Sequence, residues 1–247
     1  MKERAKSARI RERLELKLPA RVHCRETPDF EWSEVTRLLD VTPFGAGFTI
    51  KRPTERGRLL HMTIPMPRQL RVFDYVEDQY KVWAVVRYVR PLGPAADKTP
   101  RFEVGVAFIG KHPPASYETD PTRRYEVSAK PNESGMLEVK EPAPECSTPS
   151  VASERLHTRH NIPVPLSLET FTEAGEVSDI ESTITENISR GGATIFTSLD
   201  VPIGRFVRLS SPEYNLTVHG VVRGRSLGAT GMPRMHIEFV DREWPVD

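Results

Sequence analysis

Short runs of alternating apolar and polar residues follow one another through the first part of the chain. The clearest run is Tyr80–Val89, where apolar residues occupy both sides of the alternation, as in a strand buried on much of both faces. Turn signals separate the runs, and none has sustained helical periodicity, which favours a small antiparallel barrel or sandwich. Residues 23–34 are predicted to be a loop or an edge. The predicted strands are Leu18–Val22, Glu34–Leu39, Ala46–Ile50, Leu59–Met66, Tyr80–Val89 and Phe102–Ile109.

The alternation stops after the sixth run and starts again later in the chain. Residues 111–150 are rich in Pro, Ser, Thr and Glu and poor in apolar residues, so they are predicted to be a linker too polar to fold alone. A second set of strands follows this linker. Its predicted members are Ile162–Leu168, Ser182–Ile188, Ala193–Thr197, Phe206–Ser210, Leu216–Gly224 and Arg234–Val240.

The two sets share a pair of motifs in the same order. Arg9 and Arg13 precede the corner Asp40-x-Thr42-x-x-Gly45, and Arg155 and Arg159 precede the corner Asn187-x-Ser189-x-x-Gly192. The second Arg lies 27 positions before the corner in the first set and 28 positions before it in the second. Two chance turns would not share this order and spacing, so residues 1–110 and 151–247 are predicted to be tandem copies of one domain.

Composition narrows the class of protein. The 247 residues are 38% hydrophobic, which is enough for two packed cores, and the 22 Pro and 15 Gly favour short strands and turns. The formal net charge is only +1, so binding to a bulk polyanion is not indicated. Two distant cysteines, Cys24 and Cys146, give neither a zinc motif nor a disulfide framework. With no apolar leader and no run long enough to span a membrane, the sequence predicts a cytoplasmic protein without membrane insertion.

No catalytic constellation emerges from the sequence. It lacks a nucleophile elbow, a phosphate-cradling Gly loop followed by Lys, and a zinc-protease motif, and its seven His are scattered singly. We therefore expect no enzyme activity, no metal and no cofactor.

The Arg-x-x-x-Arg and (Asp/Asn)-x-(Ser/Thr)-x-x-Gly motifs, in this order and present twice, resemble those of the PilZ domain family. That family consists of small six-stranded β-barrels that bind the bacterial second messenger cyclic di-GMP. The resemblance covers both folded segments and leaves out the linker. It implies an all-β protein with two six-stranded antiparallel barrels joined by a Pro-rich linker, and cyclic di-GMP as the ligand.

The resemblance also implies which residues bind. The planar fork of Arg bonds phosphate oxygens or the guanine edge, and its face stacks on a base. In the corner, Asn187 or Asp40 would bond a guanine edge, and charged Asp40 is the better acceptor. Thr42 departs from the family's Ser, and His236 stands where the first copy has Gly105. The second copy is favoured as the binding one. The expected ligand-binding residues are Arg155, Arg159, Asn187, Ser189 and Gly192, and in the first copy Arg9, Arg13, Asp40, Thr42 and Gly45.

Two functions remain open at this point. One is an effector in which cyclic di-GMP changes the domain arrangement or the binding of an unknown downstream protein. The alternative is a nucleotide-independent adaptor that binds a protein partner through degenerate PilZ domains. Nucleic-acid binding through the basic residues 1–25 is the least favoured. We expect a monomer or a weak homodimer.

Overall fold

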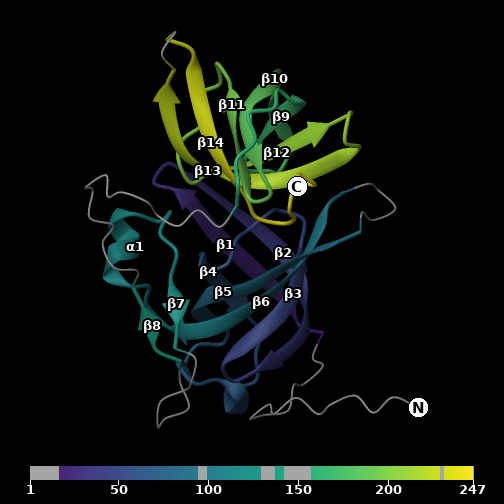
Figure 1. Ribbon diagram of the computed structural model, residues 1–247. Helices are drawn as coiled ribbons and strands as arrows, with labels where there is room; N and C mark the ends of the chain where they lie inside the picture. Colours follow the sequence, from purple (N-terminus) through teal and green to yellow (C-terminus); the bar gives the residue numbers. More distant parts are fainter. Residues whose placement is uncertain (1–16, 94–98, 129–136, 142–156, 229–230, 247) are drawn as a thin grey trace.

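A computed structural model describes residues 17–93, 99–128, 137–141, 157–228 and 231–246. It contains two closed antiparallel β-barrels of six strands each (Figure 1). The predicted all-β fold with two six-stranded barrels is therefore confirmed. In the part of the chain that the structure describes, no helix has both the length and the apolar character needed to cross a membrane.

The first barrel closes in the strand order β1-β2-β3-β6-β5-β4. Its interior holds the apolar side of every strand, including the fully buried Phe48, Tyr80 and Phe108. The rings of Tyr80 and Phe108 meet edge to face, with centroids 5.9 Å apart. Its strands are β1 (Pro19–Thr27), β2 (Phe30–Thr42), β3 (Gly45–Ile50), β4 (Leu59–Ile64), β5 (Tyr80–Leu92) and β6 (Arg101–Gly110).

Residues 23–34 differ from the sequence prediction of a loop or an edge. Strands β1 and β2 run through this segment and pair as a hairpin that turns at Pro28 and Asp29. Cys24 and Trp32 face each other across the pair, and both are buried. These two buried residues alternate with polar neighbours, which is a strand pattern. The sequence prediction missed both strands here because the outward-facing residues are so polar.

The segment after β6 packs partly on the first barrel. It forms the short helix α1 (Ala115–Thr119) and a two-stranded ribbon of β7 (Glu126–Val127) and β8 (Val139–Lys140). Tyr117 and Tyr125 are buried in a small cluster on the outer face of β4 and β5. Part of the predicted linker is thus held against the first barrel.

The second barrel closes in the order β10-β11-β14-β13-β12-β9. Trp244, which follows the last strand, is almost fully buried in its core beside Tyr214 and Phe239. The strands are β9 (Pro165–Phe171), β10 (Val177–Ser189), β11 (Gly192–Phe196), β12 (Phe206–Ser211), β13 (Leu216–Leu227) and β14 (Pro233–Phe239).

The two barrels repeat each other in detail. The carboxylate of Glu34 accepts the backbone N–H of Lys51, and the carboxylate of Glu181 accepts that of Ser198 in the same place of the second barrel. The turns that lead into β4 and β12 both contain a Gly of positive φ, Gly57 and Gly204. Shared interactions at matching positions support the predicted tandem copies.

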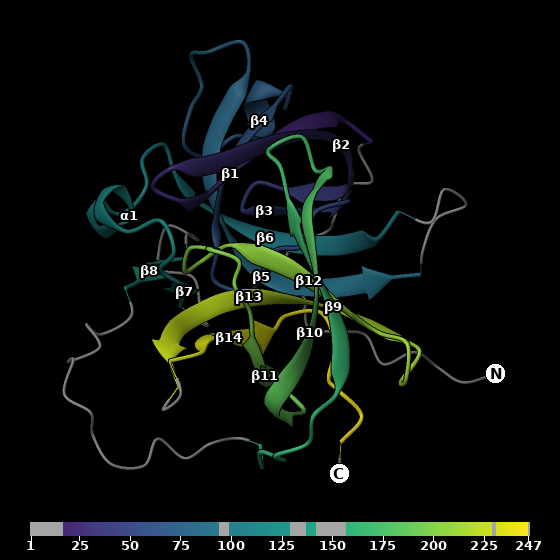
Figure 2. The same cartoon turned by 90° about the horizontal axis from the view of Figure 1, so that it is seen from above.

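These two Gly-Arg turns also lie where the barrels meet, because Arg58 of one contacts Gly204 of the other. Figure 2 shows the two barrels side by side. The fully buried Arg58 donates to the carbonyl oxygens of Glu26 and Gly204. Arg205 donates from Nε to the buried Glu26 carboxylate at 3.2 Å, and the backbone N–H of Phe206 donates to the same oxygen. A charged and hydrogen-bonded interface therefore fixes the second barrel on the first.

Candidate ligand-binding site

The polar corner of the second barrel is the tight connection between β10 and β11. Ser189 pairs directly with Gly192, and a bulge interrupts the register between Thr185 and Asn187. The same bulge lies between Leu38 and Asp40 in the first barrel. A bulge re-aims the residue next to it, so Asn187 and Asp40 occupy matching, specifically oriented positions.

The hydroxyl group of each motif closes its own corner. The Ser189 hydroxyl donates to the carbonyl oxygen of Gly192 at 3.1 Å, and the Thr42 hydroxyl donates to that of Gly45 at 3.2 Å. Thr42 retains the hydrogen bond that Ser189 makes, so its extra methyl group leaves the corner intact. These hydroxyls have a structural role in the corner.

The motif glycines bring the corner against the neighbouring strand. A Cβ atom on Gly192 would lie 2.5 Å from the carbonyl oxygen of Ile237 in β14. A Cβ atom on Gly45 would overlap the carbonyl oxygen of Val106 in β6. Only glycine permits this approach of β11 to β14 and of β3 to β6.

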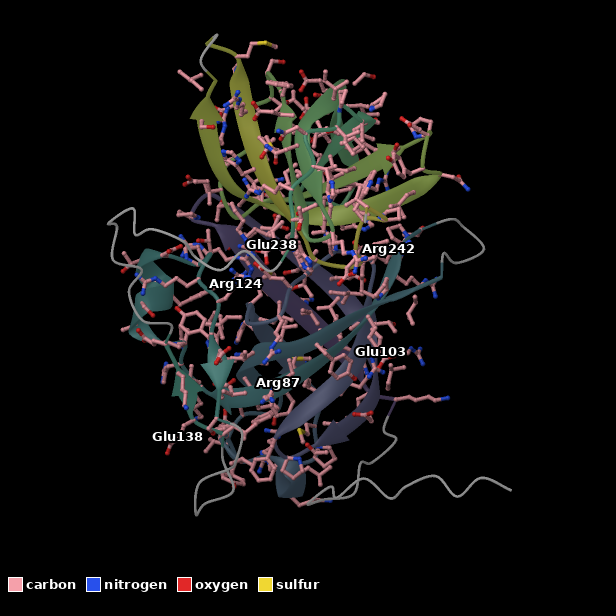
Figure 3. The ribbon with its side chains drawn as sticks, viewed as in Figure 1. Arg87, Glu103, Arg124, Glu138, Glu238 and Arg242 are labelled. Carbon is pink, nitrogen blue, oxygen red and sulfur yellow. The ribbon has the colours of Figure 1, made fainter. Side chains whose placement is uncertain are left out.

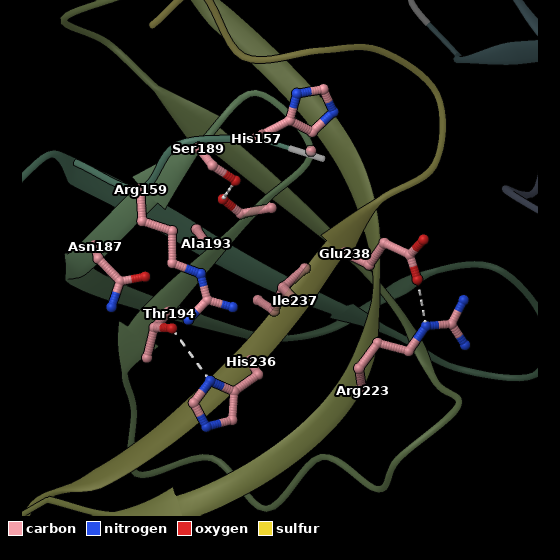
Figure 4. Close-up of a pocket in the computed structure, with 12 residues that line it drawn as sticks. His157, Arg159, Asn187, Ser189, Ala193, Thr194, Arg223, His236, Ile237 and Glu238 are labelled. Carbon is pink, nitrogen blue, oxygen red and sulfur yellow. Dashed lines mark hydrogen bonds and ion pairs between the residues drawn. The ribbon is translucent and has the colours of Figure 1, made fainter. Parts of the chain in front are cut away.

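A cavity of ≈ 260 Å³ opens beside the corner of the second barrel. The exposed Arg159 reaches it from the segment before β9, and its side chain lies among Asn187, Thr194 and His236 (Figure 4). The predicted residues Arg159, Asn187, Ser189 and Gly192 all line this cavity. Arg155 lies outside the described residues.

His236 and Thr194 form a wall that sequence reasoning did not assign to the site. The Nδ1 atom of His236 lies 3.1 Å from the Thr194 hydroxyl, and Nε2 lies 3.0 Å from the Ser226 hydroxyl. Burial, together with the positive charge of Arg159, lowers the pKa of His236. His157, which the sequence presented as a bystander, also lines the cavity.

Arg223 and Glu238 form the opposite wall and connect it to the first barrel. Arg223 donates from Nε to Glu238 at 2.7 Å and from Nη2 to the buried carboxylate of Glu55. Burial lowers the pKa of Arg223, but the charges and hydrogen bonds of Glu55 and Glu238 outweigh it and raise the net value. Arg124, which follows α1, also donates to Glu238 at 3.2 Å, at the junction of the barrels (Figure 3). The cavity is therefore joined to the domain interface by ion pairs.

The corresponding place in the first barrel is filled. Tyr88 in β5 lies opposite Gly105 in β6, and a Cβ atom on Gly105 would overlap its ring. The Tyr88 hydroxyl donates to Glu103 at 3.0 Å, and the Arg90 guanidinium lies 4.9 Å from the ring centroid. Asp40, Thr42 and Gly45 are thus near one another at the corner, whereas Arg9 and Arg13 lie outside the described residues.

Within the part of the chain that the structure describes, no group of three or more His, Cys, Asp or Glu side chains is arranged to hold a metal ion. The donors of the cavity are guanidinium, amide, hydroxyl and imidazole groups, which suit an anionic ligand with hydrogen-bonding edges.

Comparisons with known proteins agree with the geometry of the second barrel. Residues 153–243, which include all six strands of the second barrel and its corner, match the family model of the PilZ domain. The second barrel of this chain is a PilZ domain. A comparison with curated protein sequences finds no match.

Three similar solved structures have low sequence identity. The inhibitor of motility MotI/DgrA of Bacillus subtilis is 12% identical with a TM-score of 0.30, and the match covers 93% of this chain and 90% of the MotI/DgrA chain. YcgR of Escherichia coli in complex with c-di-GMP is 11% identical with a TM-score of 0.29, and the match covers 91% of this chain and 76% of the YcgR chain. PlzA of Borreliella burgdorferi in complex with c-di-GMP is 8% identical with a TM-score of 0.27, and the match covers 90% of this chain and 81% of the PlzA chain. All three TM-scores lie below 0.5.

Proposed function

We propose that the second barrel binds cyclic di-GMP in the cavity beside its corner and that binding alters the arrangement of the two barrels. The observation that carries the proposal is the convergence of Arg159 and Asn187, 28 residues apart in the sequence, on one cavity of a PilZ domain. Arg159 would contact phosphate or stack on a base, and Asn187 would bond a guanine edge. Arg155, four residues before Arg159, is proposed to act with it.

The size of the cavity limits how much of the ligand it can hold. At ≈ 260 Å³ it lies just below the range for small-molecule sites, about 300–1,000 Å³. A ligand with two bases and two phosphates would extend past the rim, where the exposed Arg159 stands. Arginine at the rim therefore supplies most of the expected affinity.

Calorimetric titration of the full chain with cyclic di-GMP tests the binding step. Charged hydrogen bonds contribute about 1.5–3 kcal/mol each, so Arg159→Ala is expected to weaken binding about tenfold or more. The double change of Arg155 and Arg159 to Ala is expected to abolish it. Arg101→Ala, at an exposed position at the start of β6, is the matched control and is expected to bind normally. Binding that is equal in the wild-type and double-variant proteins would exclude this site.

A coupling of the ligand to the domain arrangement is supported by Arg223. Its guanidinium contacts Glu238 in the cavity and Glu55 in the first barrel, and a ligand phosphate would compete with both carboxylates for it. Glu55 is buried and also pairs with Arg58 of its own barrel. Loss of Arg223, its partner from the second barrel, would therefore remove a contact between the barrels and favour a different packing of the two. A ligand can shift this equilibrium only through such differential contacts.

Spin-label distance measurements test the coupling. Val76 in the first barrel and Leu227 in the second are both exposed and can be changed to Cys for labelling, with Cys146 replaced by Ser. We expect cyclic di-GMP to shift the distance distribution and Arg223→Gln to shift it without ligand. If ligand binds and the distribution stays the same, the chain is a receptor without this rearrangement. A pull-down of one protein partner with and without nucleotide then tests the adaptor alternative, because an adaptor is indifferent to nucleotide.

A further inference from the structure

A second cavity, of ≈ 510 Å³, lies between the two barrels and shares no lining residue with the first. The first barrel contributes Glu34 and Val35 of β2 and the residues that follow β3, Lys51 and Arg52. The second contributes the β9–β10 hairpin and the strand β12. Its volume falls within the range of small-molecule sites, about 300–1,000 Å³.

The wall of this cavity is cationic. Lys51, Arg52, Arg205 and Arg208 line it, against only two lining carboxylates, Glu26 and Glu34. Glu26 is engaged by Arg205, and Glu34 accepts the backbone N–H of Lys51. Arg208 is paired with Glu169, so the excess of positive charge that is available to an anionic ligand lies on Lys51 and Arg52.

The arginines are held in place by aromatic rings and by hydrogen bonds at one end. The guanidinium carbon of Arg52 lies 5.3 Å from the Trp32 ring centroid, and that of Arg205 lies 3.2 Å from the Phe30 centroid. Arg52 donates from Nη2 to the carbonyl oxygens of Thr172 and Glu173. Among the described residues its Nε and Nη1 make no hydrogen bond, so they are available to a ligand. Burial lowers the pKa of Arg52, and a bound anion would offset that cost.

We propose that this cavity is a binding site for a small phosphate monoester, such as a sugar phosphate or a nucleoside monophosphate. Arg52 and Lys51 contact the phosphate. The site is separate from the cyclic di-GMP cavity, so a negative result at one site does not count against binding at the other.

Calorimetry on the full chain with three probes tests the proposal. Methyl phosphate carries the anion alone, ribose 5-phosphate adds a sugar, and AMP adds a flat ring as well. We expect saturable binding of ribose 5-phosphate, because Arg52 and Lys51 contact its phosphate group. AMP binding tighter than that of ribose 5-phosphate assigns the site to nucleotides, and weaker binding assigns it to sugar phosphates.

Charge changes at the rim locate the binding without disturbing the interface. Val35 lines the cavity and is 70% exposed, so both Val35→Glu and Val35→Lys are compatible with the fold. One added charge near a phosphate changes affinity by about threefold or more, weaker for Glu and tighter for Lys. Lys51→Glu is expected to act like Val35→Glu. Val76→Glu, at an 80% exposed position outside this cavity, is the control. The proposal is wrong if ribose 5-phosphate fails to bind, or if the Val35 and Lys51 changes leave its affinity unaltered.

Discussion

Tyr88 of the first barrel and Gly224 of the second occupy the same register position, opposite Gly105 and His236 respectively. Both follow a register shift in their strand, after Val86 and Val222. In the first barrel the large residue, Tyr88, is on β5 and the glycine is on β6. In the second barrel the glycine, Gly224, is on the matching strand β13, and the large residue, His236, is on β14. The space that Tyr88 fills in the first barrel is left beside His236 in the second, where the cavity lies.

This exchange predicts one cyclic di-GMP site per chain. Asn187→Ala is expected to weaken binding about tenfold, whereas Asp40→Ala at the matching position is expected to leave both affinity and stoichiometry unchanged. The measurement is calorimetric stoichiometry for the wild-type chain and the two variants. Two molecules bound per chain, with one lost in Asp40→Ala, would show that the first barrel also binds.

The glycines of the two corners are predicted to contribute to the stability of the fold. Gly192→Ala and Gly45→Ala force a Cβ atom against the carbonyl oxygens of Ile237 and Val106, and overpacking of this kind costs about 1–3 kcal/mol. Chemical denaturation measures the loss. Gly93→Ala is the control, because a Cβ atom there meets nothing within 4 Å. Equal stability of all three variants would mean that the strands separate easily at the corners.

The sequence motifs located the corner because each motif residue acts locally. Ser189 and Gly192 bond each other within one turn, and Thr42 and Gly45 do the same, so spacing alone identifies them. The remaining cavity residues could not be assigned to the site in this way. His236 and Arg223 come from β14 and β13, and only the register of those strands places them beside Asn187.

The contact between the barrels was also beyond sequence reasoning. Glu26 and Arg58 are buried charges in polar stretches, and their burial depends on residues of the other barrel, such as Arg205. A pattern of hydrophobic residues cannot reveal such a surface, because charged residues are normally solvated. The extent of β1 and β2 was missed for a related reason, since charged outward residues masked the alternation of Cys24 and Trp32.

His236 is predicted to make cyclic di-GMP binding depend on pH. Burial and Arg159 lower the pKa of His236 in the free protein, so the ring is neutral near neutral pH. A bound phosphate neutralises Arg159 and favours the charged ring, so binding takes up a proton and affinity rises as pH falls from about 8 to about 6. Calorimetry at several pH values measures this. His236→Gln is expected to flatten the profile, whereas a flat wild-type profile would place the phosphates away from His236.

Cys24 is predicted to be unreactive in the folded protein. Burial raises the pKa of its thiol to about 12, and the side chain is fully buried, so almost no accessible thiolate exists near neutral pH. In a Cys146→Ser background, a thiol reagent is expected to label the chain only after denaturant is added. Rapid labelling of the native protein would reveal local opening of the β1–β2 hairpin.

The buried ion pair between the barrels is predicted to contribute far more to stability than an exposed one. Glu26→Gln leaves Arg205 without its carboxylate in a site where the two side chains are 5% and 15% exposed. Removing one partner of such a pair costs about 3–5 kcal/mol. Asp200→Asn breaks the ion pair with Arg225, in which Asp200 is 87% exposed, and is expected to cost about 0–1 kcal/mol. Urea denaturation of both variants measures the difference. A cost for Glu26→Gln as small as that for Asp200→Asn would mean that the two barrels separate freely at this surface.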